Sequence, residues 1–285
     1  MAIILKGKEV VDKLNDELLA RSDALKEKGI TPTLGIIRLG ERPDDLAYER
    51  GAIKRAEKTG VAVEQFIFDA DITQDELIAE IDKINEDPEI SGVLMFRPLP
   101  GQIDDEAVRN ELAPEKDVDG ITDGSMAGVY SGGGNGYPPC TAEACIQIMD
   151  YYGIDPRGKN VAVIGRSQVI GKPVSMMLMQ RNATVTVCHT KTNDMAGICR
   201  DKDIIIAAAG HIGTVTEDFL SPGQIVIDVA INFDDDGNMC GDVEFDQAEP
   251  VVQAITPVPG GVGTVTTSML MKHVIEAAEK RENLI

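Results

Sequence analysis

A glycine-containing turn between an apolar run and a helical pattern is the part of the sequence best suited to chemistry. Residues 161–164 are apolar and lead into Gly165, and a helical pattern covers residues 173–180. Backbone N–H groups in such a turn can approach a pyrophosphate, and the dipole of the following helix favours its negative charge. The glycines are spaced Gly165-x5-Gly171 rather than G-x-G-x-x-G. The turn alone therefore leaves two readings open, a dinucleotide site or a tight connection in any α/β domain.

The end of the next apolar run indicates which dinucleotide would bind. Residues 184–188 end in His189, Thr190 and Lys191, and Arg166 lies in the first turn. In dinucleotide-binding domains an acidic residue at this strand end binds the 2′-hydroxyl of NAD, whereas a nearby arginine accommodates the 2′-phosphate of NADP. No acid stands here, so we predict NADP as the cofactor. Further apolar runs at 203–209 and 224–228 favour a parallel sheet covered on both faces.

Composition limits the classes of function. A hydrophobic content of 43% and a charged content of 26% are typical of a soluble globular protein, and 285 residues allow two domains. No run of 18 apolar residues and no signal-peptide layout is present, so we expect a cytoplasmic protein without a membrane span. A net charge of −21 argues against a nucleic-acid partner. The five cysteines lack metal-ligand spacing, which predicts reduced thiols and no metal site.

The first 120 residues predict a separate α/β unit. Helical patterns cover residues 9–28, 43–59 and 73–85, and strand patterns cover 33–39, 61–68 and 92–96. Thr73 and Glu76 have the spacing of a capping box. A glycine-rich stretch at 131–139 separates this unit from a helix at 141–152, which leads into the dinucleotide domain.

Several motifs occur in the order found in one enzyme family. They are Pro98-Leu-Pro100, Glu115-Lys-Asp-Val-Asp-Gly120, Pro139-Cys-Thr141, Gly165-Arg-Ser167 with Gly171 and Pro173, Asn182-Ala-Thr-Val-Thr186, and Ile255-Thr-Pro-Val-Pro-Gly-Gly-Val-Gly263. From end to end, the chain resembles the methylenetetrahydrofolate dehydrogenase/cyclohydrolase family. The resemblance implies an α/β homodimer whose subunits have two domains with a folate cleft between them. Residues 1–138, completed by a C-terminal helix at 265–285, would form the folate domain, and 139–264 a Rossmann-type, parallel-sheet NADP domain.

The resemblance also implies roles for particular residues. Tyr48 would pack on the folate and Asp119 would bind the pterin amino group, and both are candidate catalytic residues. Pro259, Gly260 and Gly261 would let the backbone approach the pterin and the nicotinamide. Without the resemblance, the tyrosine reads as a packing residue and the others as turn residues. The cofactor-binding residues that the resemblance implies are Gly165, Arg166, Ser167, Gly171, Pro173, His189, Thr190 and Ile231.

Two residues of the family pattern are absent. The family has a lysine one helical turn after the tyrosine, where this chain has Ala52, and a glutamine where it has Phe96. An offset in the alignment is the alternative, but Gly60 and Pro98 anchor both segments without gaps. Lys54 points away from the Tyr48 face, and Arg55 returns to that face about 10 Å further along the helix.

The two absences affect the two family reactions differently. Hydride transfer from 5,10-methylenetetrahydrofolate requires distance and orientation, whereas hydrolysis of the methenyl product requires a group that moves protons. We therefore predict an NADP-dependent methylenetetrahydrofolate dehydrogenase whose cyclohydrolase activity is in doubt. The alternatives are a fully bifunctional enzyme that makes 10-formyltetrahydrofolate and a non-enzymatic protein that binds folate and NADP.

Overall fold

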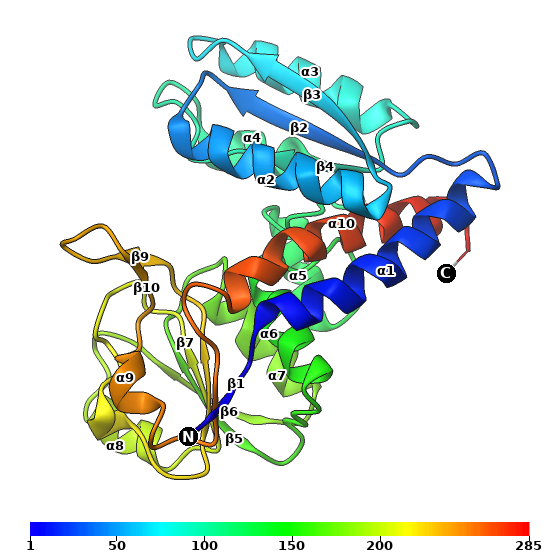
Figure 1. Ribbon diagram of the computed structural model, residues 1–285. Coiled ribbons are helices and arrows are strands. Elements are labelled where there is room, and N and C mark those ends of the chain that lie inside the picture. Colours follow the sequence, from blue (N-terminus) through cyan, green and yellow to red (C-terminus); the bar gives the residue numbers. More distant parts are fainter. Residues whose placement is uncertain (285) are drawn as a thin grey trace. The chain divides into compact units, whose positions relative to one another are not determined.

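The computed structural model describes residues 1–284, which form two compact units (Figure 1). One comprises Met1–Asp12 and Thr141–Thr266, and we call it the six-strand unit after its main sheet. The other comprises Lys13–Cys140 and the residues from Thr267 onward, and we call it the three-strand unit. Both combine parallel strands with helices, so the predicted two-domain α/β fold is confirmed.

The six-strand unit has the sheet of a dinucleotide-binding domain. Its strand order is β1-β11-β8-β7-β5-β6, and every neighbouring pair is parallel. The chain runs from β5 to β6 on one side and returns to β7 on the other, so the strand order reverses at β5. Ligands of such sheets bind at the carboxyl ends of the strands beside this reversal. The bounds are β1 Ile3–Ile4, β5 Asn160–Ile164, β6 Thr184–Cys188, β7 Ile204–Ala207, β8 Ile225–Asp228 and β11 Ala254–Ile255.

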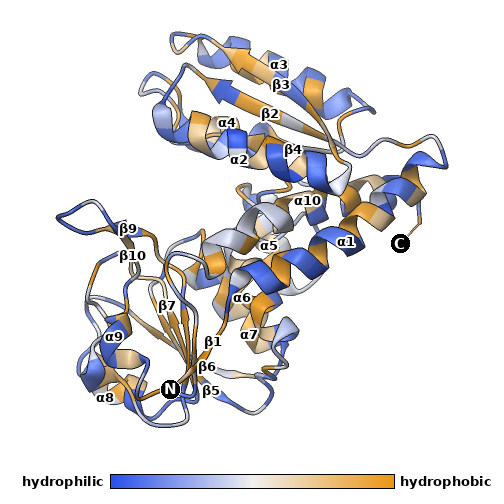
Figure 2. Ribbon diagram, in the orientation of Figure 1, coloured by the Kyte–Doolittle hydropathy of each residue, from blue (hydrophilic) through white to orange (hydrophobic). Residues whose placement is uncertain are grey.

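The strands of this sheet are apolar because helices cover them. β5 has four consecutive buried residues, β7 is buried throughout, and Figure 2 shows these strands as hydrophobic. After β8 the chain makes a short antiparallel hairpin of β9 (Asn232–Phe233) and β10 (Met239–Cys240), which the sequence did not predict. The helices are α6 Cys140–Tyr151, α7 Gly171–Gln180, α8 Met195–Arg200 and α9 Phe245–Ala248, with a 3-10 turn η1 at Glu217–Phe219.

The N-terminus belongs to the six-strand unit, which corrects the expectation that the first 120 residues form one separate unit. Ile3 and Ile4 form the edge strand β1, which pairs with Ala254 and Ile255. A strand of two residues is too short to show a period in the sequence, so only the paired structure reveals it.

The three-strand unit is a parallel sheet between helices. Its order is β3-β2-β4, with bounds Ala62–Phe68, Thr33–Leu39 and Gly92–Met95. Ile37 and Leu39 of β2 face α3 (Gln74–Glu86) and α4 (Asp105–Glu111) in one core, whereas Arg38 faces α2 (Pro43–Thr59), in keeping with the alternation of a strand. Figure 1 shows α2 and α3 on opposite sides of this sheet.

Local signals set the ends of several helices. The capping box predicted at Thr73 and Glu76 is present at the start of α3. Gly60 ends α2 in the left-handed conformation with a φ of 72°. The N-cap residue of α5 (Asp123–Ser131) is Thr122, whose side chain accepts a hydrogen bond from the Ser125 N–H.

Two long helices continue from one unit into the other along the chain. These are α1 (Gly7–Lys26) and α10 (Val262–Arg281), which starts earlier than the resemblance implied. Within the three-strand unit they lie side by side (Figure 1), and Arg21 of α1 pairs with Glu276 and Glu279 of α10. Among the described residues, no helix is both long and apolar enough to cross a membrane.

Candidate functional site

The turn after β5 requires a glycine at its first position. Gly165 has a φ of 126°, and a Cβ atom there would lie 2.1 Å from the carbonyl oxygen of Ala208. Its N–H donates to the carbonyl oxygen of Cys188 at 2.9 Å, and the Ala208 N–H donates to Ile164 at 2.8 Å. The turn therefore lies against the carboxyl ends of both neighbouring strands, β6 and β7, where a dinucleotide is expected.

The second glycine allows α7 to begin directly on this turn. A Cβ atom on Gly171 would lie 2.3 Å from the carbonyl oxygen of Gly165. This close approach explains the unusual spacing, because a five-residue loop leaves the turn and returns to it at a position that only glycine can occupy. Pro173 is buried in the first turn of α7, where its missing N–H has no cost.

The hydrogen bonds of the loop identify the donors available to a pyrophosphate. The Ser167 hydroxyl accepts from the N–H groups of Ile170 and Gly171 at 3.1 and 3.4 Å, and the Ser167 carbonyl accepts from Lys172 at 3.0 Å. The first N–H groups of α7 are thus already engaged. Within the described residues, the N–H groups of 166–169 have no partner, so we expect these loop groups to bind the phosphates.

The end of β6 carries polar groups without an acid, as predicted for an NADP site. His189 is half-buried, its N–H donates to the Thr192 hydroxyl at 2.9 Å, and its Nδ1 accepts from the Lys191 N–H at 3.1 Å. Thr190 and Arg166 are exposed. Since Nδ1 accepts a hydrogen bond, a proton on this ring lies on Nε2, which can donate to a ligand oxygen.

A cavity of about 230 Å³ brings together residues that were predicted separately. Ile231, Pro259, Gly260 and Gly261 line it, together with Asp228 at the end of β8. Ile231 has 54% of its surface exposed, so its side chain is accessible to a ligand in this cavity. The predicted nicotinamide and pterin contacts of the six-strand unit therefore share one cavity.

Two buried carboxylates beside this cavity were missed by the sequence analysis. Asp228 accepts hydrogen bonds from the N–H groups of Asp242 and Val243 at 3.1 and 3.0 Å. Burial raises the pKa of Asp228 to about 7, and the charge of Asp242 adds to this, while the N–H donors oppose it. Their separation in the sequence gives no periodic signal, so the pair was not predictable.

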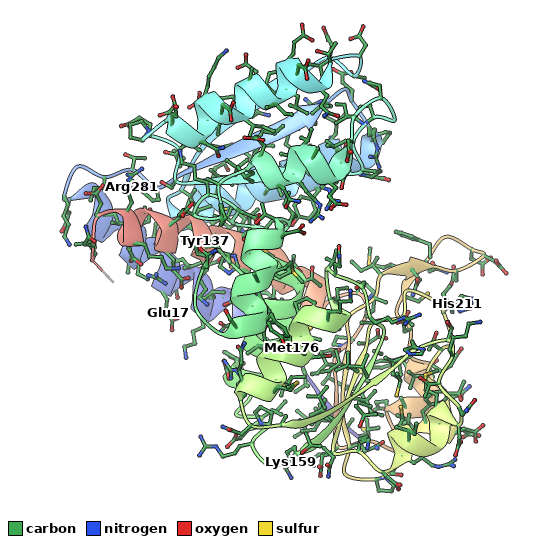
Figure 3. The ribbon with its side chains drawn as sticks, turned by 180° about the vertical axis from the view of Figure 1, so that it is seen from behind. Glu17, Tyr137, Lys159, Met176, His211 and Arg281 are labelled. Atoms are coloured by element: carbon green, nitrogen blue, oxygen red, sulfur yellow. The ribbon has the colours of Figure 1, made fainter. Side chains whose placement is uncertain are left out.

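Asp242 ties two loops at the carboxyl end of the sheet to each other. It accepts N–H hydrogen bonds from Ala209, Gly210 and His211 at 2.6, 3.0 and 2.7 Å, and one from the Asn232 side chain at 3.0 Å. Figure 3 shows His211 close to the hairpin that carries Asn232. The loops after β7 and β8 are therefore fixed at the edge where the cofactor is expected.

In the three-strand unit, Tyr48 packs edge to face on Phe96. Their ring centroids are 5.8 Å apart at an interplanar angle of 82°. Burial, followed by the charge of Asp119, raises the pKa of Tyr48 well above its usual value. The two predicted folate residues, Tyr48 and Asp119, are thus electrostatic neighbours. Ala52 is fully buried on the same helix.

Asp119 is half-buried, and opposing effects of its surroundings act on the pKa of its carboxyl group. Burial raises the pKa of this carboxyl to about 6, and the charge of Asp117 acts in the same direction. A hydrogen bond from the Cys140 thiol lowers the pKa, as do the charges of His273 and Arg97. At neutral pH the carboxylate form, which can accept N–H donors, is the major one.

The arginines of these two segments, Arg55 and Arg97, have partners of their own. Arg55 contacts Asn15 and Thr267, at 3.1 and 3.4 Å. Arg97 binds the carboxylate of Asp105, with its Nε 2.6 Å from the nearer oxygen. Neither guanidinium gives up a proton near neutral pH, so neither substitutes for a lysine as an acid–base group.

Two family models match the chain over both units. One, described as tetrahydrofolate dehydrogenase/cyclohydrolase, catalytic domain, matches residues 5–119, and the other, the NAD(P)-binding domain of the same family, matches residues 139–282. The bifunctional protein FolD of Alkaliphilus metalliredigens is 46% identical over 284 residues, which is all of both chains.

Solved structures agree with this match. The bifunctional FolD enzyme of Campylobacter jejuni has a TM-score of 0.95 at 35% identity, covering 99% of this chain and all of the other. The FolD of Trypanosoma brucei, complexed with NADP cofactor and inhibitor, has a TM-score of 0.90 at 34% identity, covering 100% and 99%. The Gly165 turn, the six-strand sheet and these matches lead to one conclusion: the chain belongs to the tetrahydrofolate dehydrogenase/cyclohydrolase family.

Proposed function

We propose that this protein oxidises 5,10-methylenetetrahydrofolate to 5,10-methenyltetrahydrofolate with NADP+. A hydride leaves the one-carbon bridge and joins C4 of the nicotinamide, which is the chemistry that the bound cofactor supplies. The observation that carries the proposal is the turn at the strand-order reversal, where Gly165 and Gly171 allow close approach. Arg166 follows Gly165, whose N–H donates to Cys188 at the end of a strand that carries no acid. The NADP in the Trypanosoma brucei structure supports the same choice of cofactor.

The residues of the chain would bind, orient and shield the reactants. The carboxylate of Asp119 would accept N–H donors from the pterin edge, a charge-assisted contact that fixes the orientation of the ring. The ring of Tyr48 would pack on the folate, supported from the side by Phe96. Gly260, with a φ of 103°, would let the backbone approach the nicotinamide beside Ile231. The substrate-facing and cofactor-facing roles of these residues are part of the proposal.

We further propose that the cyclohydrolase step is weak. Ala52 and Phe96 stand where the family pattern has a lysine and a glutamine, and an alkyl and a phenyl side chain cannot move a proton. The Phe96 ring, with 9% of its surface exposed, packs on Tyr48 and leaves an apolar surface there. Loss of a positioned acid–base group typically costs about 10²–10⁴-fold in rate.

A fully bifunctional enzyme is the second candidate function. It is favoured by the relative from Alkaliphilus metalliredigens, which is named a bifunctional protein at 46% identity over the whole chain. A non-enzymatic protein that binds folate and NADP is the third, and the presence of Tyr48 and Asp119 together with the Gly165 turn counts against it. The family resemblance also implies a homodimer in the cytoplasm, and sedimentation of the purified protein would test the dimer.

A spectrophotometric assay tests the main proposal. The purified chain is given 5,10-methylenetetrahydrofolate with NADP+ or NAD+, and formation of the reduced cofactor is followed. We expect NADPH to form with Michaelis kinetics and NAD+ to be a poorer substrate. An Asp119→Ala variant should lose most activity through a raised KM for the folate, whereas Glu115→Ala, at an exposed position in the same motif, should behave as wild type. Absence of NADPH formation by the folded protein would favour the non-enzymatic reading.

A further inference from the structure

Two buried side chains from distant parts of the chain meet at the peptide group that precedes Asp119. The carbonyl oxygen of Val118 lies 2.7 Å from Nδ1 of His273 and 3.3 Å from Sγ of Cys140. His273 belongs to α10 and Cys140 is the first residue of α6. Each has only 1% of its surface exposed, so both contacts are inside the three-strand unit.

The chemistry of the donors fixes where the protons lie. A carbonyl oxygen only accepts, so Nδ1 of His273 must carry a hydrogen to make a contact of 2.7 Å. The 3.7 Å approach between Cys140 Sγ and the same Nδ1 therefore cannot be a bond from the thiol to the ring. The single S–H hydrogen of Cys140 is left for one of two acceptors within its reach, the Val118 carbonyl or the Asp119 carboxylate.

The imidazole is held from behind by an aromatic ring. Tyr137 packs on His273 with ring centroids 5.0 Å apart, and the Lys280 ammonium lies 4.4 Å from the centre of the tyrosine ring. Figure 3 shows Tyr137 beside α10, the helix that ends at Arg281. Tyr137 is itself 3% exposed, so the two rings pack together in the interior of the three-strand unit.

The backbone on the other side of Asp119 is also fixed. Gly120 has a φ of 67°, and a Cβ atom there would lie 2.5 Å from the backbone nitrogen of Pro139. The buried carboxylate of Asp117 accepts from the N–H groups of Ile121 and Thr122 at 3.0 and 2.8 Å. Asp119 therefore projects from a segment that is clamped before and after it.

We propose that His273, through the Val118 carbonyl, and Cys140, through its thiol, are positioning residues that fix the Asp119 carboxylate for the pterin edge. This role rests on the proposed function, in which Asp119 binds the pterin. His273 acts on the backbone through its N–H donor, and Cys140 acts on the carboxylate itself through its thiol. Because the two are almost completely buried beneath the loop, they support Asp119 rather than contact the substrate.

The charged and titratable groups around Asp119 come from several elements. They are Tyr48 of α2, Arg97 after β4, Asp117 on the same loop, Cys140 of α6 and His273 of α10. Burial and Asp117 favour the protonated carboxyl, and the thiol, His273 and Arg97 favour the ionised form. Removing the thiol removes the strongest of the stabilising contacts, so the carboxyl should hold its proton to a higher pH.

Carbon-13 NMR of the carboxyl groups in the unliganded full chain tests the thiol directly. Asp119 is assigned by its loss in Asp119→Asn. We expect its titration midpoint to rise by up to about one unit in Cys140→Ala, because a donor to the charged form is lost, and to stay near wild type in Cys140→Ser, which keeps a donor. Cys145→Ala is the matched control, since that thiol is also buried on α6 but donates to the backbone carbonyl of Thr141. An unchanged midpoint in Cys140→Ala would overturn the thiol's role.

The histidine is tested by a pair of variants. His273→Asn can keep an N–H donor to Val118, whereas His273→Leu cannot. We expect His273→Leu to raise the KM for the folate at least several-fold more than His273→Asn does. The KM for NADP+ should be unchanged in both variants. Equal KM values for the two variants would overturn the positioning role of His273.

These outcomes separate the inference from the function on which it rests. A shifted Asp119 midpoint in Cys140→Ala, with no change in tetrahydrofolate affinity in either Cys140→Ala or Asp119→Asn, would uphold the thiol contact and refute Asp119 as the pterin ligand. Should Cys140→Ala fail to fold, Cys140→Val would still report, because it fills the space of the thiol without a donor: the midpoint should rise in Cys140→Val and stay at the wild-type value in Cys145→Val.

Discussion

At the scale of single residues, we propose that the choice of cofactor depends on Arg166. Its guanidinium is exposed in the loop where the N–H groups of 166–169 remain available. We expect Arg166→Ala to raise the KM for NADP+ at least tenfold and to leave that for NAD+ nearly unchanged, because only NADP+ carries the 2′-phosphate. Initial rates with both cofactors would measure this, with Arg157→Ala, an exposed arginine of the same unit, as the control. Equal increases for the two cofactors would show that Arg166 does not read the 2′-phosphate.

The ionisation of Asp119 predicts how folate binding depends on pH. Its pKa is raised to about 6 in the folded protein, and only the carboxylate can accept both N–H donors of a pterin edge. Affinity for tetrahydrofolate should therefore be full above pH 7 and fall as the pH drops through about 6, approaching tenfold per pH unit below it. Anaerobic calorimetry between pH 5 and 8 measures the effect, and Asp119→Asn should abolish it. A flat profile for the wild-type protein would be inconsistent with this role.

Residues differ in how far the sequence alone could identify them. Gly165 and Arg166 were predicted from local spacing, because a strand, a turn and a helix follow one another directly in the chain. Tyr48 and Asp119 were predicted only through the family resemblance, since neither has a local signature. The Asp228–Asp242 pair and the contact of Cys140 with His273 could not be predicted, because they form between segments that fold together from distant positions.

At the scale of elements, the turn between β5 and α7 depends on the absence of a side chain. In Gly165→Ala the new Cβ would lie 2.1 Å from the Ala208 carbonyl, so the end of β7 and the cofactor loop must shift. We expect a loss of stability of about 1–3 kcal/mol and at least tenfold weaker NADP+ binding. Gly153→Ala is the control, since Gly153 also has a positive φ but open space around it. Thermal unfolding and calorimetry of the two variants separate the effect of the steric clash from the cost of placing alanine at a positive φ. An NADP+ affinity equal to that of the wild type in Gly165→Ala would contradict the prediction.

Periodicity located the longer elements well and the short ones poorly. The strands Thr33–Leu39 and Thr184–Cys188 and the helix Pro43–Thr59 have the predicted bounds. The two-residue strands β1, β9 and β10 were missed because a period needs several residues to appear. α10 begins at Val262, before the predicted start, although the residues that follow are rich in β-branched types with low helix propensity. Burial of Val262 and Val265 overrides that local preference.

At the scale of the whole molecule, the first residues of the chain support a loop from its far end. The Gly7 N–H donates to the Gly260 carbonyl at 2.8 Å, and a Cβ atom on Gly7 would lie 2.3 Å from the Gly261 carbonyl. Gly7→Ala should displace this loop and raise the KM for folate or for NADP+ several-fold while the protein stays folded. Gly101→Ala, with open space around it, is the control. Unchanged kinetics in Gly7→Ala would show that the loop tolerates the shift or has no part in binding.

The number and class of the domains followed from the sequence, whereas the place of the N-terminus did not. Apolar runs separated by helical patterns are enough to predict a parallel sheet in the dinucleotide domain and a second α/β unit before it. The crossing of residues 1–12 into the six-strand unit depends on two backbone-paired residues, Ile3 and Ile4, and on the Gly7 contact. Such contacts join segments from opposite ends of the sequence, and neither segment alone carries a pattern that predicts them.

The fate of the methenyl product tests the central claim most directly. NADPH and 5,10-methenyltetrahydrofolate are followed together by absorbance during oxidation of the methylene substrate, and decay of the methenyl compound is compared with its rate in buffer. We predict that the methenyl product accumulates one for one with NADPH, and that Ala52→Lys combined with Phe96→Gln accelerates its hydrolysis. Neither change need suffice alone, since groups that act as a unit are not additive. A wild-type protein that hydrolyses the methenyl product as fast as it forms would contradict the account and would assign proton transfer to another group.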